Sequence, residues 1–390
     1  MVRASFGDDI VKIVFYCQHI LGIGHFFRTR EICEKLKAHD VVLVTGGDRP
    51  DIPLPEHVRE LRLPGLMMDE DFKNMFSTEE GKSIDAVKKE RRNMLFRLFE
   101  EMSPDVFMTE LYPFGRKAFR FELDPLLERI RERSLRPCRV VCSLRDVLVE
   151  KENAASHEGR VIKLLNRYFD TLLVHSDPRF LKLEATFSRL DDISIPIVYT
   201  GFVTPKPVPG SGKALRAKLD IGHNDRFVVA STGGGKVGGE LLTAVVKAVV
   251  RLPGGCRLQV FTGPFLDQES FFGLKSFESP VIRVDRFTPE FLSFLDAADV
   301  SVSMAGYNTS MNLMAAGTPA LVWPFAQNRE QRLRAESLAK LGGLRILSDK
   351  DLYPERLAGL MMRMLDEKKK PASEIDLNGA ENTAVWISER

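Results

Sequence analysis

The sequence of 390 residues lacks an excess of charge of either sign. Its 56 Lys and Arg residues are balanced by 54 Asp and Glu residues, which leaves a formal net charge of +2. A dedicated nucleic-acid-binding protein carries a one-sided basic surface, so this balance argues against a nucleic acid as partner. With 44% apolar residues the chain can form two or three domains, each with its own core.

Long apolar runs and paired cysteines are also missing. No stretch approaches the roughly 20 apolar residues of a membrane span. The first residues contain two acids ahead of a short apolar run and no small-residue cleavage site, unlike a signal peptide. Five scattered cysteines without a CxxC pair are typical of reduced, buried thiols. We therefore expect a cytoplasmic protein.

Short β-rich runs alternate with amphipathic segments, a pattern that predicts parallel sheets covered by helices. In the first half we expect strands at 10–17, 40–46, 105–110, 139–144 and 171–175, and helices around 26–38, 79–102, 118–133 and 156–168. In the second half we expect strands at 227–232, 257–263, 281–287, 299–304 and 319–324, and helices near 237–251, 289–297, 308–316 and 328–341. The Pro- and Gly-rich stretch 199–213 between them is the best candidate for a linker.

The expected fold class is therefore α/β, with two Rossmann-like, doubly wound domains. We place the first domain at 1–200 and the second at 201–374, followed by a C-terminal helix at 375–390 that crosses back to the first domain. Open parallel sheets bind ligands at the carboxyl ends of their strands, so two facing domains predict a ligand cleft between them.

The first strand is followed by the sequence GIGH, in which Gly22 and Gly24 predict a tight turn and His25 begins a helix. Glycines let a ligand approach the backbone, and a helix N-terminus favours negative charge. The same helix end lowers the pKa of a histidine, which keeps it neutral and able to accept a proton at pH 7. His25 is our candidate general base; the alternative is a helix-capping histidine in an ordinary turn.

Two loops of the second half have the composition of a phosphate site. The sequence STGGGK offers the hydroxyls of Ser231 and Thr232, the backbone of Gly233, Gly234 and Gly235, and the cation of Lys236 for a diphosphate. It lacks Walker A spacing, which argues against kinase or ATPase chemistry, and a purely structural turn is the alternative. In the other loop, Gly306 lies in a turn, Asn308, Thr309 and Ser310 suit a helix N-cap, and Gly317 closes the helix.

Polar residues at the strand ends of the first half predict an acceptor side. Glu110, Tyr112, Arg116 and Lys117 in TELYPFGRK are suited to a carboxylate or phosphate of an acceptor. Arg145 and Asp146 follow the next strand; they join this side or form a structural ion pair. Either Glu110 or Asp146 would orient His25. We expect His175 to be a packed, hydrogen-bonded histidine.

The stretch from Gly306 to Gln331 resembles the donor-site signature of GT-B glycosyltransferases, in particular the MurG-like branch. The matching positions are Gly306, Thr309, Asn312, Gly317, Pro319, Pro324 and Gln331. STGGGK matches the family's diphosphate loop, and GIGH matches the loop that carries its catalytic histidine. The chain is also similar, over nearly its whole length, to a set of predicted bacterial glycosyltransferases, on the motifs FYCQHILGIGHFFRTR, TELYPFGRKAFRFEL, VCSLRD, VHSDPRF, YTGF and GYNTSMNLM.

The resemblance implies an inverting transferase that needs no metal or cofactor and moves a sugar from a nucleotide-sugar, with a UDP-sugar favoured, to an acceptor hydroxyl. It places Phe287 at the nucleobase, Asn312 at the ribose, and Glu330 and Gln331 at the sugar. A core position for Phe287 and a surface position for the other two are the alternatives. Asn312 replaces a family glutamate, so the charge-assisted bond to the ribose is lost, although its carbonyl can still accept.

Other functions stay open on the sequence. The same site could pass the sugar to water, as a nucleotide-sugar hydrolase does, and Asn312 motivates a non-catalytic nucleotide-sugar-binding protein. An epimerase is disfavoured because its set of acidic residues is missing. The acceptor is unknown; a lipid-linked or anionic one would bring the protein to the inner membrane face, where the stretch 88–100 offers a basic amphipathic surface. The alternative is a helix that packs its Leu and Phe side chains on the sheet.

Overall fold

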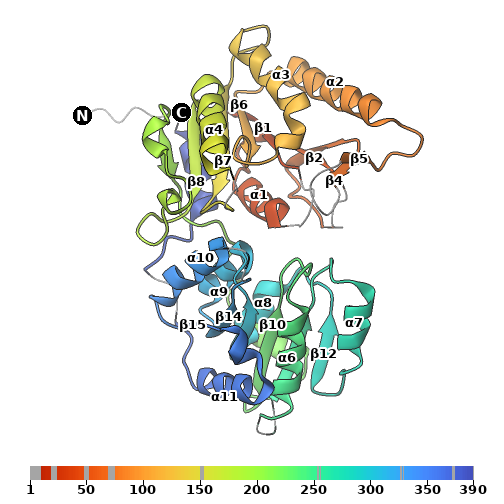
Figure 1. Ribbon diagram of the computed structural model, residues 1–390, viewed down its shortest axis with the longest axis vertical. Coiled ribbons are helices and arrows are strands. Elements are labelled where there is room, and N and C mark those ends of the chain that lie inside the picture. Colours follow the sequence, from red (N-terminus) through yellow and green to blue (C-terminus); the bar gives the residue numbers. More distant parts are fainter. Residues whose placement is uncertain are drawn as a thin grey trace. The chain divides into compact units, whose positions relative to one another are not determined.

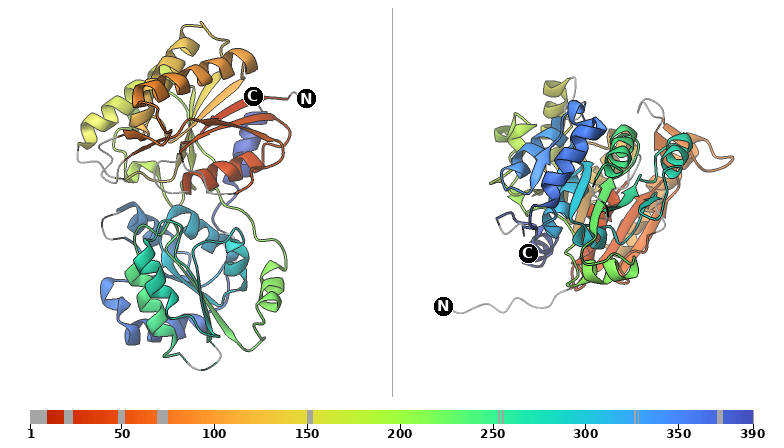
Figure 2. Two further views of the ribbon diagram at one scale, coloured as in Figure 1. Left: turned by 90° about the vertical axis from the view of Figure 1, so that its right-hand side faces the viewer. Right: turned by 90° about the horizontal axis from the view of Figure 1, so that it is seen from below.

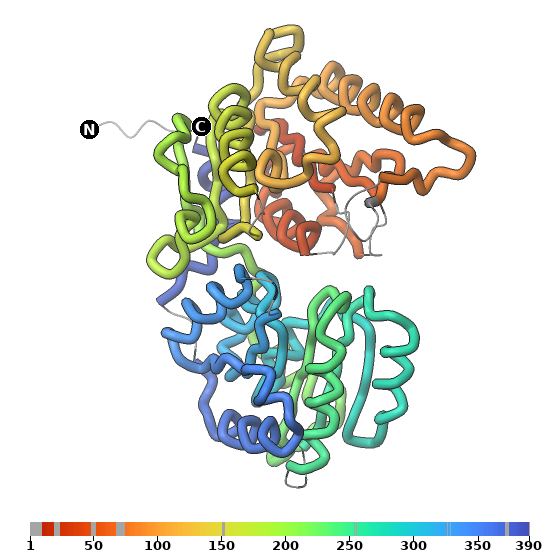
Figure 3. Tube along the Cα trace, in the orientation of Figure 1, coloured from red at the N-terminus to blue at the C-terminus, as the bar shows by residue number. Residues whose placement is uncertain are grey.

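The computed structural model describes residues 10–18, 24–47, 52–68, 75–149, 153–252, 254, 256–325, 327, 329–370 and 374–389. The chain forms two compact units. The first unit comprises Met1–Val203 and Asn378–Arg390, and the second comprises Thr204–Leu377. The chain therefore passes between the units twice, after Val203 and after Leu377, and Figure 3 traces this path.

The first unit contains a seven-stranded parallel sheet with the strand order β3-β2-β1-β6-β7-β8-β9. Its strands are β1 (Lys12–Tyr16), β2 (Asp40–Gly46), β3 (Val58–Leu63), β6 (Val106–Glu110), β7 (Arg139–Arg145), β8 (Thr171–His175) and β9 (Ile197–Tyr199). A small antiparallel pair, β4 (Leu66–Met68) and β5 (Met75–Ser77), lies outside this sheet. Because β1 lies between β2 and β6, the segments after β1 and β6 emerge side by side at the carboxyl edge.

Helices cover both faces of this sheet (Figure 1). They are α1 (Gly24–Glu34), α2 (Ile84–Met102), α3 (Arg120–Arg131), α4 (Ala154–Tyr168) and α12 (Gly379–Ser388), with short 3₁₀ turns η1 (Lys117–Phe119), η2 (Leu183–Ala185) and η3 (Leu190–Asp192). Val14 and Tyr16 point to the face covered by α2, α3 and α4, and Ile13 and Phe15 point to the face covered by α1 and α12. This alternation is the two-residue period of a strand that is buried on both sides.

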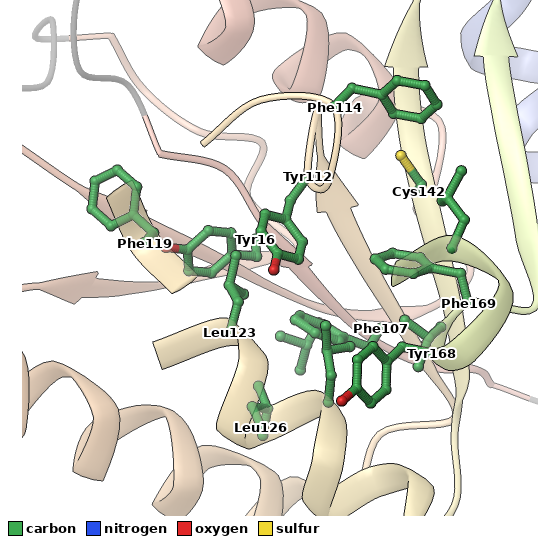
Figure 4. Packing of buried hydrophobic residues seen from close by; sticks show 14 of the residues in the cluster. Tyr16, Phe107, Tyr112, Phe114, Phe119, Leu123, Leu126, Cys142, Tyr168 and Phe169 are labelled. Atoms are coloured by element: carbon green, nitrogen blue, oxygen red, sulfur yellow. The ribbon is translucent and has the colours of Figure 1, made fainter. Parts of the chain in front are cut away.

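Aromatic side chains fill the larger core of the first unit. Phe99 of α2 meets Phe107 of β6 edge to face, with ring centroids 5.0 Å apart, and Figure 4 shows Phe107 near Tyr168 and Phe169. Leu95 and Phe99 are buried against the sheet, which confirms the packing alternative for residues 88–100.

A fully buried ion pair joins α2 to α3. Arg91 donates from Nε and Nη2 to the two carboxylate oxygens of Glu122, at 2.8 and 2.6 Å, and from Nη2 to Oε1 of Gln18 at 2.9 Å. The Tyr16 hydroxyl also donates to Glu122. Gln18 follows β1, so this network fixes the chain where it leaves the sheet toward His25.

Helix α12 returns to the first unit, as the dark blue helix of Figure 2 shows. A bridge between Val203 and Asn378 precedes it. A Cβ on Gly379 would lie 2.3 Å from the carbonyl oxygen of Gly201, so only glycine allows this close approach of two backbones. Buried side chains of α1 and α12, among them Phe26, Ile32 and Trp386, share one core cluster, and Lys35, just after α1, pairs with Glu381 at 3.3 Å on the surface.

The second unit contains a six-stranded parallel sheet with the order β12-β11-β10-β13-β14-β15. Its strands are β10 (Arg226–Ser231), β11 (Cys256–Phe261), β12 (Ile282–Asp285), β13 (Val300–Met304), β14 (Ala320–Trp323) and β15 (Leu344–Ile346). Its helices are α5 (Ser211–Lys218), α6 (Gly239–Val249), α7 (Gln268–Lys275), α8 (Phe291–Ala297), α9 (Tyr307–Ala316), α10 (Arg329–Ala339) and α11 (Pro354–Leu365), with the 3₁₀ turn η4 (Asp349–Leu352). Helices α6 and α11 pack on Val228 and Ala230 of the central strand.

The expected elements are present, but several others were not predicted. Strands β3, β4, β5, β9 and β15 and helices α5, α7 and α11 had no counterpart in the prediction. The stretch 199–213 is more ordered than a linker: it begins with the end of β9 and runs into α5, and the chain changes units within it, after Val203.

Candidate active site

His25 and Glu110 form a hydrogen-bonded pair in the first unit. His25 is the second residue of α1, as expected, and Glu110 is the last residue of β6. The two elements leave neighbouring strand ends, which brings Nδ1 of His25 within 2.6 Å of Oε1 of Glu110. The structure therefore selects Glu110, and not Asp146, as the residue in contact with the histidine. An ionised Glu110 accepts the Nδ1 proton, and Nε2 then carries the lone pair.

The charges around this pair fix its protonation. Burial lowers the pKa of His25 to about 4, although Glu110 raises it; Arg116 and Arg28 lower it further. Burial would raise the pKa of Glu110, but His25, Arg28 and Arg116 outweigh this and hold it far below its usual range. At pH 7 the histidine is neutral and the glutamate is ionised. The neutral state was predicted from the helix end, but burial is the larger cause.

Two arginines hold the carboxylate of Glu110. Arg28, one helical turn after His25, is buried and donates from Nη2 to Oε1 of Glu110. Nη2 of Arg116 lies 3.6 Å from the other oxygen, Oε2. Within the described part of the chain, no hydrogen-bond partner is found for the buried atoms Nε and Nη2 of Arg116 and Oε2 of Glu110. Arg116, predicted for the acceptor side, thus lies beside the His25–Glu110 pair. Arg28 was not predicted. Its position three residues after His25, which puts both on one face of α1, could have indicated it.

The structure does not bring all predicted acceptor residues to this cluster. The predicted acceptor role of Tyr112 is wrong. Its ring is buried in the core and its hydroxyl donates to Asp124 of α3, so it does not face a ligand (Figure 4). Lys117 is exposed in η1, Arg145 is half-buried at the end of β7, and Asp146 is fully buried. Gly24 begins α1, whereas Gly22 lies outside the described residues.

His175 is a packed histidine, as expected. Its Nε2 contacts the Ser143 hydroxyl at 2.7 Å and its Nδ1 contacts the Thr200 hydroxyl at 2.8 Å. Burial, followed by Arg28, lowers its pKa to about 3, so it stays neutral in the folded protein.

The triple-glycine loop of the second unit connects β10 to α6. The Ser231 hydroxyl oxygen accepts from the N–H of Gly233 at 3.1 Å, and the Thr232 hydroxyl donates to the carbonyl oxygen of Thr262 at 2.8 Å. Both hydroxyls therefore shape the loop. Gly235 has a φ of 84°, and a Cβ there would lie 2.2 Å from the Thr262 carbonyl oxygen. The backbone conformation and the close approach therefore require glycine at this position. Gly233 is exposed and Gly234 is half-buried, and they form the accessible part.

Helix α9 begins beside this loop. A Cβ on Gly233 would lie 3.5 Å from the Thr309 hydroxyl. The helix cap differs from the prediction: Gly306 is the N-cap and makes no side-chain cap bond, whereas Asn308, Thr309 and Ser310 lie in the first turn. Helix α6 also begins without a side-chain cap. Two helix N-termini that lack a side-chain cap, beside the exposed Gly233, are suited to an anion such as a diphosphate.

The predicted ribose residue Asn312 is half-buried, one turn further along α9. Its carbonyl oxygen Oδ1 accepts from the Thr204 hydroxyl at 2.9 Å. Thr204 is the first residue of the second unit. The acceptor atom expected to serve a ribose is thus already engaged within the protein.

The residues predicted for base and sugar have unequal surroundings. Phe287, after β12, is 39% exposed, so the core alternative is wrong. Glu330 is buried in the first turn of α10, so its surface alternative is also wrong. Gln331 is half-buried, and its Oε1 accepts from the N–H of Phe325 at 3.1 Å. Arg334, which was not predicted, is fully buried and donates to the carbonyl oxygen of Ala305 at 2.9 Å. Ala305 directly precedes Gly306, the N-cap of α9.

Among the residues that the structure describes, no group of His, Cys, Asp and Glu side chains is arranged to hold a metal ion. No helix in the same residues has the length and apolar content to cross a membrane.

The comparison with known families concerns mainly the second unit. Residues 231–389 match the model of the glycosyltransferase family 28 C-terminal domain. This stretch includes both the triple-glycine loop and α9.

Known proteins with similar sequences and structures agree with this match. A Synechococcus sp. (strain CC9605) protein, UDP-N-acetylglucosamine--N-acetylmuramyl-(pentapeptide) pyrophosphoryl-undecaprenol N-acetylglucosamine transferase, is 28% identical over 235 residues, 59% of this chain and 60% of that protein. The match thus spans less than two thirds of the relative's length. The crystal structure of Acinetobacter baumannii MurG, at 14% identity and a TM-score of 0.56, covers 97% of this chain and all of that one. The crystal structure of the kitacinnamycin glycotransferase, at 16% identity and a TM-score of 0.60, covers 98% and 99%.

These structural likenesses show the fold. The chain has the two-domain, Rossmann-like GT-B fold, which confirms the fold class. Together with the family match, they confirm the resemblance to MurG-like proteins that the sequence motifs indicated.

Proposed function

We propose that the protein is an inverting glycosyltransferase that moves a sugar from a nucleotide-sugar, with a UDP-sugar favoured, to an acceptor hydroxyl without a metal ion. The observation that carries this proposal is the contact between His25 and Glu110, within a chain whose residues 231–389 match the family 28 C-terminal domain. A neutral histidine oriented by a buried carboxylate is the arrangement that removes a proton from a hydroxyl.

The roles of the residues follow from their surroundings. Nε2 of His25 takes the acceptor proton, and Glu110 stabilises the imidazolium that forms. The oxygen attacks the anomeric carbon from the side opposite the leaving group, which inverts that centre. The accessible Gly233 and Gly234 and the first turn of α9 at Thr309 stabilise the departing diphosphate, whose negative charge grows in the transition state.

The relatives' names suggest the finer form of the substrates. They specify UDP-N-acetylglucosamine and an undecaprenol-linked pyrophosphoryl acceptor. We propose a lipid-linked acceptor of this kind, met at the inner membrane face by a protein that is otherwise cytoplasmic. Phe287 keeps its proposed role toward the base, and Glu330 and Gln331 keep theirs toward the sugar. Asn312 contacts the ribose through its amide NH₂ group or the second lone pair of Oδ1, because the Thr204 hydroxyl occupies the first.

The test combines purified protein with a panel of UDP-, GDP- and dTDP-sugars, each with and without an undecaprenyl-pyrophosphoryl acceptor. We expect nucleotide release that depends on the acceptor. H25A should lower kcat by about 10²- to 10⁴-fold, the usual contribution of a general base, and leave the Kd for the nucleotide unchanged. H39A is the control, since His39 contacts Ser388 of α12 and not the Glu110 cluster.

Each contrary result points to a named alternative. Release of nucleotide and free sugar at enzyme-like turnover without acceptor would make the protein a hydrolase. Nucleotide-sugar binding without turnover on the whole panel would make it a binding protein. An H25A variant with wild-type kcat would remove the proposed base.

A further inference from the structure

Phe265 presents an aromatic ring to solvent directly beside the triple-glycine loop. The side chain is 47% exposed. Its backbone N–H donates to the carbonyl oxygen of Gly234 at 3.0 Å, and ring atom Cδ2 lies 3.9 Å from where a Cβ on Gly234 would stand. The ring is thus at the edge of the proposed diphosphate site, and it was not predicted from the sequence.

The turn that carries Phe265 is held on several sides. Arg286 donates from Nη1 to the carbonyl oxygen of Leu266 at 2.7 Å, and its guanidinium stacks 4.1 Å from the ring centroid of Phe271. The N–H of Gly263 donates to the carbonyl oxygen of Arg286 at 2.8 Å. Gly263 has a φ of 81°, and a Cβ there would lie 2.5 Å from the Gly233 carbonyl oxygen. The backbone that carries the exposed ring is therefore held in place before any ligand binds, which reduces the entropy that binding costs.

We propose that Phe265 forms the aromatic face on which the nucleobase of the sugar donor stacks, an inference that rests on the proposed function. An exposed aromatic ring on a well-held turn beside a phosphate site offers its π-face to a planar base, whatever the base. Phe287, also exposed, follows Arg286, whose carbonyl oxygen accepts from the N–H of Gly263 in the turn before Phe265.

The strand order separates the base from the sugar. In the sheet, β10 lies between β11 and β13. The diphosphate loop follows β10, and Thr309 follows β13 on one side of it. Phe265 follows β11 on the other side, toward the edge strand β12. The residues proposed for the sugar, Glu330 and Gln331, follow β14, so a nucleotide-sugar whose diphosphate lies on Gly233 extends its base toward Phe265.

The test measures the Kd of UDP and of 5,6-dihydro-UDP, whose reduced base is no longer planar and aromatic. The wild type should bind UDP more tightly than the dihydro analogue. F265A should raise the Kd for UDP by about 5- to 150-fold, the factor that corresponds to about 1–3 kcal/mol of base stacking. In F265A the preference for UDP over the analogue should disappear.

Phe272 of α7 provides the matched control, because it is 63% exposed and its ring contacts Phe271. F272A should leave both Kd values unchanged. If the wild type binds UDP and F265A retains the full preference over dihydro-UDP, Phe265 does not stack on the base and the inference is overturned. An F265A effect on UDP-sugars but not on UDP would assign the ring to the sugar and also overturn it. Failure of the wild type to bind any nucleotide contradicts the proposed function itself.

Discussion

The low pKa of His25 makes the stability of the first unit depend on pH in a predictable way. The unfolded chain protonates this histidine below about pH 6.5, whereas the folded chain does so only near pH 4. Below pH 6.5 the unfolded state therefore binds the additional proton, and the folded state loses stability as the pH falls toward 4. A pKa change from 6.5 to about 4, at about 1.4 kcal/mol per pH unit, corresponds to about 3 kcal/mol.

The experiment compares the free energy of unfolding of the wild type and H25Q in urea between pH 7.5 and 4. The chain has two tryptophans, and Trp386 lies in α12 of the first unit. A W323F background makes its fluorescence report that unit alone. The stability of H25Q relative to the wild type should rise by about 3 kcal/mol as the pH falls through this window. His175 titrates in both proteins, so its contribution cancels.

A control and a second variant sharpen the interpretation. H223Q removes an exposed histidine of the second unit, and its curve should run parallel to that of the wild type. E110Q removes the charge that raises the pKa of His25, so the NMR titration midpoint of this histidine should fall below about 4. A stability difference between wild type and H25Q that stays constant from pH 7.5 to 4 would refute the buried, neutral histidine.

Two further substitutions test the structural supports of the site. G235A places a Cβ at a φ of 84° and 2.2 Å from a backbone carbonyl oxygen, so it should destabilise the second unit by about 2 kcal/mol or more; G234A, whose nearest neighbour is 3.9 Å away, should change stability by less than about 0.5 kcal/mol. R91M leaves the buried carboxylate of Glu122 unpaired and should cost about 3–5 kcal/mol in urea unfolding, whereas R97M on the exposed face of α2 should be nearly neutral. Equal effects within either pair would contradict the packing described.

The sequence predicted the buried strands because parallel strands covered on both faces appear as short apolar runs. It missed β3 because this strand lies at the sheet edge, where Arg59, Glu60 and Arg62 interrupt the apolar pattern. It missed α7 because two of its aromatic residues, Phe271 and Phe272, are adjacent and do not form a one-sided helical stripe.

The candidate site was predictable in its loops and less so in its contacts. Both Glu110 and Asp146 follow buried strands, and only the position of β6 next to β1 selects Glu110. The core position of Tyr112 depends on Asp124, a partner in the following helix that no local signal indicates. The Thr204–Asn312 bond joins residues 108 positions apart, so the sequence could not show that the asparagine oxygen is engaged.

The same charges that fix His25 also bear on its strength as a base. A pKa of about 4 describes a weak base, because burial and two neighbouring arginines disfavour the imidazolium. Under the proposed function, the histidine becomes an imidazolium when it takes the acceptor proton. The carboxylate of Glu110 favours this charged form and raises the pKa of His25, against the effects of burial and the two arginines. The strength of the base therefore depends on the 2.6 Å contact between Nδ1 of His25 and Oε1 of Glu110.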